Sequence, residues 1–120
     1  MQLDWTEGPL AEGLQLYRDG KFFEAHEAWE TVWSVAEGPE RSLLQALIQI
    51  TAAFHHLTRK NNRIGASLLL EQALGRLLKL PDQFGGIEVD LLAEEIRERI
   101  RQFQQGLDVT PIVVQTVQDN

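Results

Sequence analysis

The sequence predicts an all-α fold, a single-domain bundle of about five helices built from antiparallel helical hairpins. Apolar residues recur at intervals of three and four along most of the chain, which is the helical period. Strand-like alternation of apolar and polar residues is nearly absent. Turn signals rich in Gly, Pro and Asn separate the helical stretches by short connections, and short connections favour antiparallel neighbours.

The first two helices are predicted over residues 9–18 and 21–36. The pair Asp19-Gly20 is a turn signal that ends the first helix. We interpret Gly38-Pro39 as the signal that ends the second helix.

The third helix is predicted over residues 40–60 and should be the most buried element. No Asp, Glu, Lys or Arg lies between Arg41 and Arg59. One face of this helix carries apolar side chains at helical spacing. They are Leu43, Leu47, Ile50, Phe54 and Leu57.

The last two helices are predicted over residues 64–80 and 90–105, with Asp90 as the N-cap of the fifth. Between them, Pro81-Asp82 and Gly85-Gly86 are expected to form a loop.

The chain is expected to consist of a helical bundle and a short tail. The bundle would occupy residues 1–107. Residues 108–120 would form a C-terminal tail that is partly docked on it, with frayed last residues.

Composition excludes several classes of function. The 18 acidic and 11 basic side chains give a formal net charge of −7, which would repel a phosphate backbone, so no nucleic-acid partner is expected. The longest segment without formal charge, residues 42–58, is too short and too polar to span a bilayer, so no membrane partner is expected either. The absence of cysteine excludes disulfides and thiolate chemistry. With no targeting segment recognised at the N-terminus, we expect a small soluble cytoplasmic protein.

The second predicted helix carries the candidate functional site. A helical reading places Phe22, His26, Trp29 and Trp33 on one face, with Glu30 at its edge. Trp29 and Trp33 are expected to be largely buried. His26 and Glu30, at i and i+4, would then lie among aromatic core residues, where polar groups cost free energy unless they pair or bind something.

The third predicted helix supplies two further candidate residues. Gln49 and His56 lie on the side opposite its leucine stripe, together with Gln45 and Ala52. Because no charged residue lies on that side, we expect a polar seam against another helix. A seam close to His26 would form a usable pocket, but sequence leaves the distance between His56 and His26 open.

A known family shares the pattern His-x3-Glu-x2-Trp, matched here by His26, Glu30 and Trp33. The segments 20–27 and 47–49, and Asn62 followed by Gly65-Ala66, are also similar. The chain thereby resembles domain of unknown function 309, a family of small bacterial and archaeal proteins, over roughly residues 14–107. The resemblance implies an all-helical bundle and a suggested metal site, and it supplies no substrate or reaction.

Several interpretations of the His26 and Glu30 pair stay open. The pair is a structural polar network, a divalent-metal or small-ligand site, or an acid–base catalyst. Neither the zincin signature nor a carboxylate di-iron motif is present, and a metal would need further ligands. The alternative function is a helical-hairpin module that binds a protein partner or a second copy of the chain. Sequence does not decide whether the protein is an enzyme.

Overall fold

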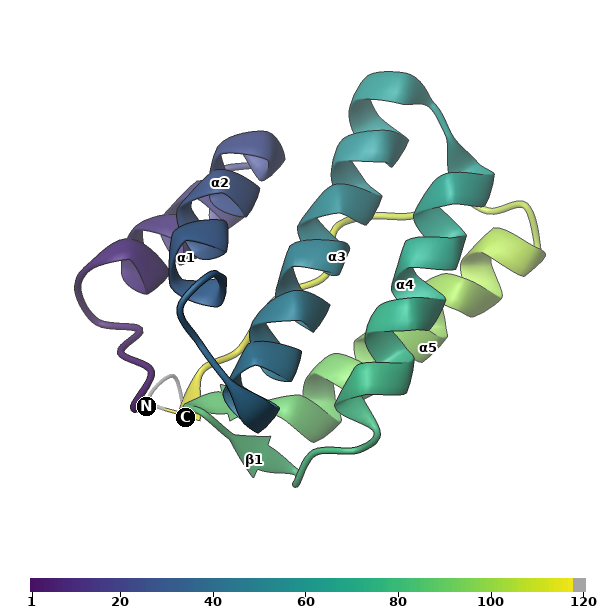
Figure 1. Ribbon diagram of the computed structural model, residues 1–120. Helices are drawn as coiled ribbons and strands as arrows, with labels where there is room; N and C mark the ends of the chain where they lie inside the picture. The colour runs from purple at the N-terminus through teal and green to yellow at the C-terminus, as the bar shows by residue number, and fades with distance from the viewer. Residues whose placement is uncertain (118–120) are drawn as a thin grey trace.

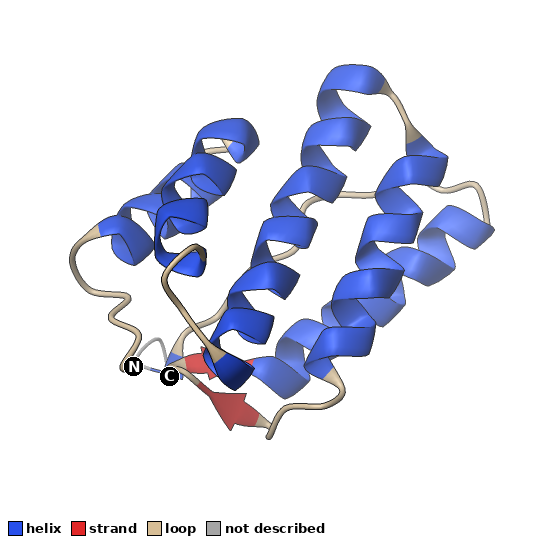
Figure 2. Ribbon diagram, viewed as in Figure 1, coloured by secondary structure: helices blue, strands red, loops and turns tan. Residues whose placement is uncertain are grey.

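The computed structural model describes residues 1–117, and five helices make up most of this part of the chain, as Figure 1 and Figure 2 show. The all-α prediction is therefore confirmed. The helices are α1 (Pro9–Arg18), α2 (Phe22–Trp33), α3 (Gly38–Lys60), α4 (Arg63–Leu77) and α5 (Val89–Gln104). Within residues 1–117, no helix is long and apolar enough to cross a membrane.

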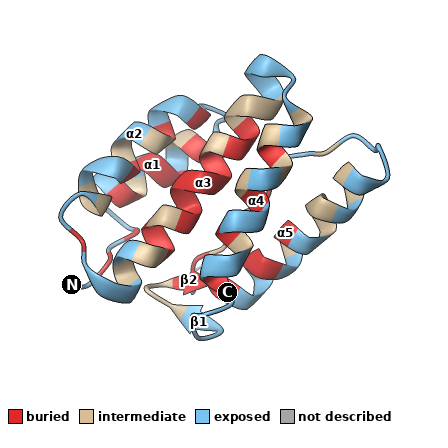
Figure 3. Ribbon diagram, turned by 45° about the vertical axis from the view of Figure 1, so that its right-hand side comes forward, coloured by how far each residue is buried: buried red, intermediate tan, exposed pale blue. Residues whose placement is uncertain are grey.

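The helices pack in chain order, with α3 at the centre. Helix α1 packs on α2, α2 on α3, α3 on α4, and α4 on α5. In Figure 1, α1 and α2 lie on one side of α3, and α4 lies on the other side of α3. Figure 3 shows buried residues concentrated along α3, which contributes more of them than any other helix, as expected from its uncharged sequence.

Two helix boundaries differ from the sequence prediction. Gly38-Pro39 begins α3 and does not end α2, which already ends at Trp33. Proline is tolerated in the first turn because the first N–H groups of a helix have no partner within it. Asp90 lies inside the first turn of α5, whose N-cap is Glu88.

A small antiparallel hairpin replaces the expected loop before α5. Strands β1 (Gln83–Phe84) and β2 (Ile87–Glu88) pair through Gly85 and Gly86. Both glycines have positive φ angles, 59° and 83°, as the tight two-residue turn of a hairpin requires. Sequence patterns miss strands this short because two residues show no alternation.

The tail packs back onto the bundle. Ile112, Val114 and Thr116 are buried, and Thr116 bridges to Ile87 in β2. The Tyr17 hydroxyl in α1 donates a hydrogen bond to the carbonyl oxygen of Ile112 at 2.6 Å. The expected fraying concerns residues 118–120, which lie outside the described part of the chain.

Close packing between α1 and α2 centres on Trp29, which has no exposed surface. Its indole Nε1 donates a hydrogen bond to the Leu10 carbonyl at 3.1 Å, and its ring stacks on Tyr17 with centroids 6.2 Å apart. A Cβ atom added at Gly13 would come within 2.3 Å of Nε1. The missing side chain of Gly13 therefore sets how closely α1 and α2 approach.

Candidate functional site

The His26 and Glu30 pair lies at the surface of α2. His26 Nδ1 is 3.4 Å from Glu30 Oε2, as the i,i+4 spacing predicts, but the two side chains are 32% and 54% exposed. The expectation that the pair lies inside an aromatic core is therefore wrong. Trp29 points into the contact with α1, whereas His26 lies at the rim of the interface between α2 and α3. An ion pair this exposed contributes little to stability.

The structure brings all three histidines of the chain to one pocket between α2 and α3. We call this cavity of about 120 Å³ the histidine pocket. It is lined by Phe22, Phe23, His26, Ala52, His55 and His56. The question that sequence left open, whether His56 lies near His26, is thus answered.

His56 has an unsatisfied polar atom. Its Nδ1 is buried and has no hydrogen-bond partner. Most buried polar atoms in folded proteins have a partner, so an unpartnered nitrogen in a histidine that lines the pocket needs an explanation. The neighbouring His55 ring lies 6.4 Å from the His56 ring and 5.8 Å from the Phe23 ring, between centroids.

The surroundings of His55 favour its neutral form. Burial is the largest cause that lowers the pKa of His55, followed by the positive charge of Lys60. His56 and Arg59 lower the pKa further, whereas Glu24 raises it. A neutral imidazole offers one hydrogen-bond donor and one acceptor to a bound molecule.

A second hollow adjoins the histidine pocket and shares Phe22, Phe23 and His55 with it. It has a volume of about 250 Å³, and its charged lining residues are Lys21, Arg59 and Glu24. Two cations and one anion make this hollow slightly positive in an otherwise acidic protein. Sequence patterns gave no reason to select His55 or Phe23, because their role depends on how α2 crosses α3.

The other predicted site residues lie elsewhere. Trp29 is a core residue. Trp33 is only partly buried, contrary to our expectation, and the Arg41 guanidinium lies 4.1 Å from its ring centroid. Gln49 is buried in a seam with α4, where its Nε2 donates a hydrogen bond to Gln72 Oε1 at 3.1 Å. Gln49 Oε1 is buried without a partner. The predicted polar seam is therefore divided between two helices. At Gln49 it faces α4, and at His56 it faces α2.

A metal site at His26 and Glu30 gains no support. Among residues 1–117, no group of three or more His, Asp or Glu side chains could hold a metal ion. Zinc sites in proteins have at least three protein ligands. The imidazoles of the pocket, beside its apolar walls, can take part in hydrogen bonding and proton transfer.

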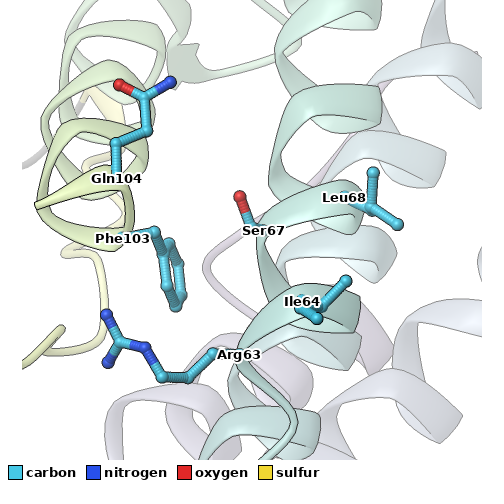
Figure 4. Close-up of a pocket in the computed structure, with 6 residues that line it drawn as sticks. All are labelled: Arg63, Ile64, Ser67, Leu68, Phe103 and Gln104. Carbon is cyan, nitrogen blue, oxygen red and sulfur yellow. The ribbon is translucent and has the colours of Figure 1, made fainter. Parts of the chain in front are cut away.

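A larger hollow contains none of these residues. It measures about 460 Å³ and lies between α4 and α5 (Figure 4). Its one charged residue, Arg63, is engaged: the guanidinium lies 5.0 Å from the Phe103 ring centroid and donates a hydrogen bond to the Leu107 carbonyl at 2.8 Å. Its remaining lining residues are Ile64, Ser67, Leu68 and Gln104. This hollow is an apolar surface feature, separate from the histidine pocket.

The names of similar proteins state no activity. A crystal structure of a conserved hypothetical protein from Thermus thermophilus is 36% identical, with a TM-score of 0.66, and the match covers 84% of this chain and 99% of that one. An uncharacterised protein from Aquifex aeolicus (strain VF5) is 30% identical over 90 residues, which are 74% of this chain. The match spans only 27% of the length of that curated relative.

The model of a protein family, domain of unknown function (DUF309), matches residues 10–68. The matched segment runs from α1 into α4 and includes every residue that lines the histidine pocket. The chain belongs to the DUF309 family.

Proposed function

We propose that this protein binds a small molecule in the histidine pocket. The observation that carries the proposal is that His56, whose buried Nδ1 has no hydrogen-bond partner, lines one cavity together with the other two histidines. A bound molecule whose hydrogen-bonding group reached this nitrogen would satisfy it, as buried polar atoms normally are.

The pocket walls indicate the class of ligand. Phe22, Phe23 and Ala52 provide apolar contacts, and the histidines provide donors and acceptors at the edge of flat rings. A cavity of about 120 Å³ has room for only a few non-hydrogen atoms. A small planar molecule with a polar edge fits this combination, and the slightly positive hollow beside the pocket favours a neutral or singly negative one.

The motif residues have distinct roles in this proposal. The Glu30 carboxylate beside His26 Nδ1 favours a proton on that nitrogen, which leaves Nε2 as the acceptor. Glu30 is then a positioning residue, and His26 and His56 are the residues that contact the ligand.

A fragment screen by NMR tests the proposal directly. Small planar compounds are added to the protein, and the imidazole nitrogen signals of its three histidines are followed. We expect at least one compound to shift the signals of His26 and His56. The Ala52→Leu variant, which fills the cavity, should abolish this binding.

The matched control is Ala28→Leu, the same substitution at a partly buried alanine of α2 that lines none of the hollows described above. Binding should persist in this variant. Ligand binding that survives Ala52→Leu, or a broad compound set that leaves the imidazole signals unmoved, would contradict the proposal. Melting curves recorded with zinc and with a chelator test for a metal ligand. A chelator-sensitive Tm in the parent that is absent in His26→Ala would show that the ligand is a metal ion and not a small molecule.

Self-association is the second candidate function, and the exposed apolar face of α4 favours it. Ile64 is 79% exposed and Leu68 is 53% exposed, and both border the 460 Å³ hollow. An interface between two identical copies uses the same patch on both, so the protruding Ile64 of one copy would enter the hollow of the other. Sedimentation equilibrium should show a dimer that Ile64→Lys dissociates, and a parent that stays monomeric at high concentration would remove this candidate.

A further inference from the structure

A hollow of different chemistry lies at the other end of α3. It has a volume of about 300 Å³ and forms where the end of α2, the start of α3 and the end of α4 meet. Its lining residues are Trp33, Gly38, Arg41, Ser42, Gln45 and Arg76. No carboxylate is among them, although the chain has 18 acidic side chains against 11 basic ones.

The polar side chains that line this hollow have unused hydrogen-bond donors. Among residues 1–117, the side chains of Arg41, Ser42, Gln45 and Arg76 form no hydrogen bond and no ion pair with another residue. Two exposed arginines, a serine and a glutamine therefore line one space that no carboxylate residue lines.

The arginines of α5 behave differently. Each pairs with a glutamate one helical turn away, the pairs being Arg97 with Glu94, Arg99 with Glu95, and Arg101 with Glu98. Arg76 has no carboxylate three or four residues away, and Arg41 has only Glu37, at the N-cap of α3, with which it forms no ion pair. The fold places both arginines at one hollow.

Trp33 positions one of the two arginines. The Arg41 guanidinium lies 4.1 Å from the Trp33 ring centroid, a distance typical of a cation–π contact. Within residues 1–117, no N–H group of Arg41 donates to a protein acceptor, so these groups remain available to a ligand. The N–H edges of a guanidinium match the two oxygens of a phosphate or carboxylate group.

We propose that this hollow binds a compact oxyanion with two negative charges, held between Arg41 and Arg76. Ser42 and Gln45 would donate further hydrogen bonds to its oxygens. Bringing two guanidinium groups together is unfavourable without a counter-charge, and a dianion removes that repulsion. The site is separate from the histidine pocket and does not depend on the function proposed for that pocket.

The proposal is tested by titrating the protein with inorganic phosphate at constant ionic strength, with chloride as the replaced anion. The Arg Nε–H signals in NMR spectra and the Tm report binding. We expect phosphate, and not chloride, to shift the signals of Arg41 and Arg76 and to raise the Tm as a ligand of the folded state does. Malonate, a dianion with two separate carboxylates, serves as a second probe and distinguishes a site for one tetrahedral dianion from a site for two carboxylates.

Charge-removing variants identify the residues. Arg41→Gln and Arg76→Gln should each weaken phosphate binding by roughly tenfold or more, the effect of losing one charged hydrogen-bonding partner. Arg76→Lys should retain part of the affinity, because it keeps the charge and loses the fork geometry. Arg97→Gln is the matched control, because it makes the same change of charge on another helix.

Two results would overturn the proposal. One is equal phosphate affinity in the parent, Arg41→Gln and Arg76→Gln. The other is a parent whose signals respond to chloride and phosphate alike. Ala52→Leu should leave phosphate binding unchanged, so failure here and failure of the histidine-pocket proposal give different results.

Discussion

Gly13 offers a sharp test of how the helix that carries the candidate site is held in place. A Cβ atom at this position would lie 2.3 Å from Trp29 Nε1 and 2.5 Å from Cδ1. Both contacts are far inside van der Waals distance, and Trp29 has no exposed surface into which its ring could turn. Gly13→Ala must therefore push α1 away from α2 or displace the indole.

The expected cost follows from three contributions. Alanine is the better helix former, which favours the variant by about 1 kcal/mol. Overpacking of a filled core costs about 1–3 kcal/mol. Displacing the indole would also break its hydrogen bond to the buried Leu10 carbonyl, at about 1–3 kcal/mol. The net result is a loss of roughly 3 kcal/mol, which lowers the Tm by roughly 10 °C in a domain of this size.

Thermal and urea unfolding of Gly13→Ala measure this loss, and Gly75→Ala is the matched control. Gly75 also lies inside a helix, but a Cβ atom added there would meet nothing within 4 Å. The control should be stabilised by about 0.5–1 kcal/mol, the usual gain of alanine over glycine in a helix. If Gly13→Ala is stabilised like Gly75→Ala, the contact between α1 and α2 is not as close as described.

Three further predictions concern other parts of the molecule. Tyr17→Phe should cost about 1–3 kcal/mol because the buried Ile112 carbonyl loses its hydrogen-bond donor. Burial raises the pKa of Tyr17, so the parent protein should lose stability as pH rises above about 10. Tm measurements from pH 8 to 11 should show less of this loss in the variant. Because the pKa of His55 is lowered, the contribution of His55 to stability is present above about pH 6.5 and is lost as pH falls through its folded-state pKa. His55→Gln should therefore reduce the fall in Tm between pH 7.5 and 5.5. An unchanged pH profile of the Tm would refute this. Trp33→Ala should lower the free energy of unfolding in urea by less than the about 3–5 kcal/mol typical of a fully buried aromatic, because Trp33 is only partly buried beneath Arg41. A loss of about 3–5 kcal/mol would contradict the placement of Trp33.

Local signals predicted the helices well. Apolar spacing and the turn residues located all five within a few residues of their observed ends. The central place of α3 was also predictable, because a long segment without formal charge can be stable only when it is buried. Gly38-Pro39 was misassigned because the same pair is compatible with the end of one helix and the start of the next.

The candidate site was predictable only in part. The approach of His26 and Glu30 follows from their i,i+4 spacing alone. Trp29 and Trp33 share a helix face in the sequence, yet only Trp29 lies opposite Gly13 and is fully buried. Periodicity shows which side chains share a face of a helix, and it does not show how far the partner helix extends along that face.

The fold class, the helices and the pairing of His26 with Glu30 were predictable from the sequence, because each of these depends on residues within a few positions of one another. Which side chains from different helices meet is known only from the folded structure. It placed His26, His55 and His56 at one pocket and Arg41 and Arg76 at another hollow. The physical reason is that such meetings depend on the angle and distance between packed helices. Contacts such as that between Gly13 and Trp29 set these quantities, and the two residues that make this contact lie on different helices.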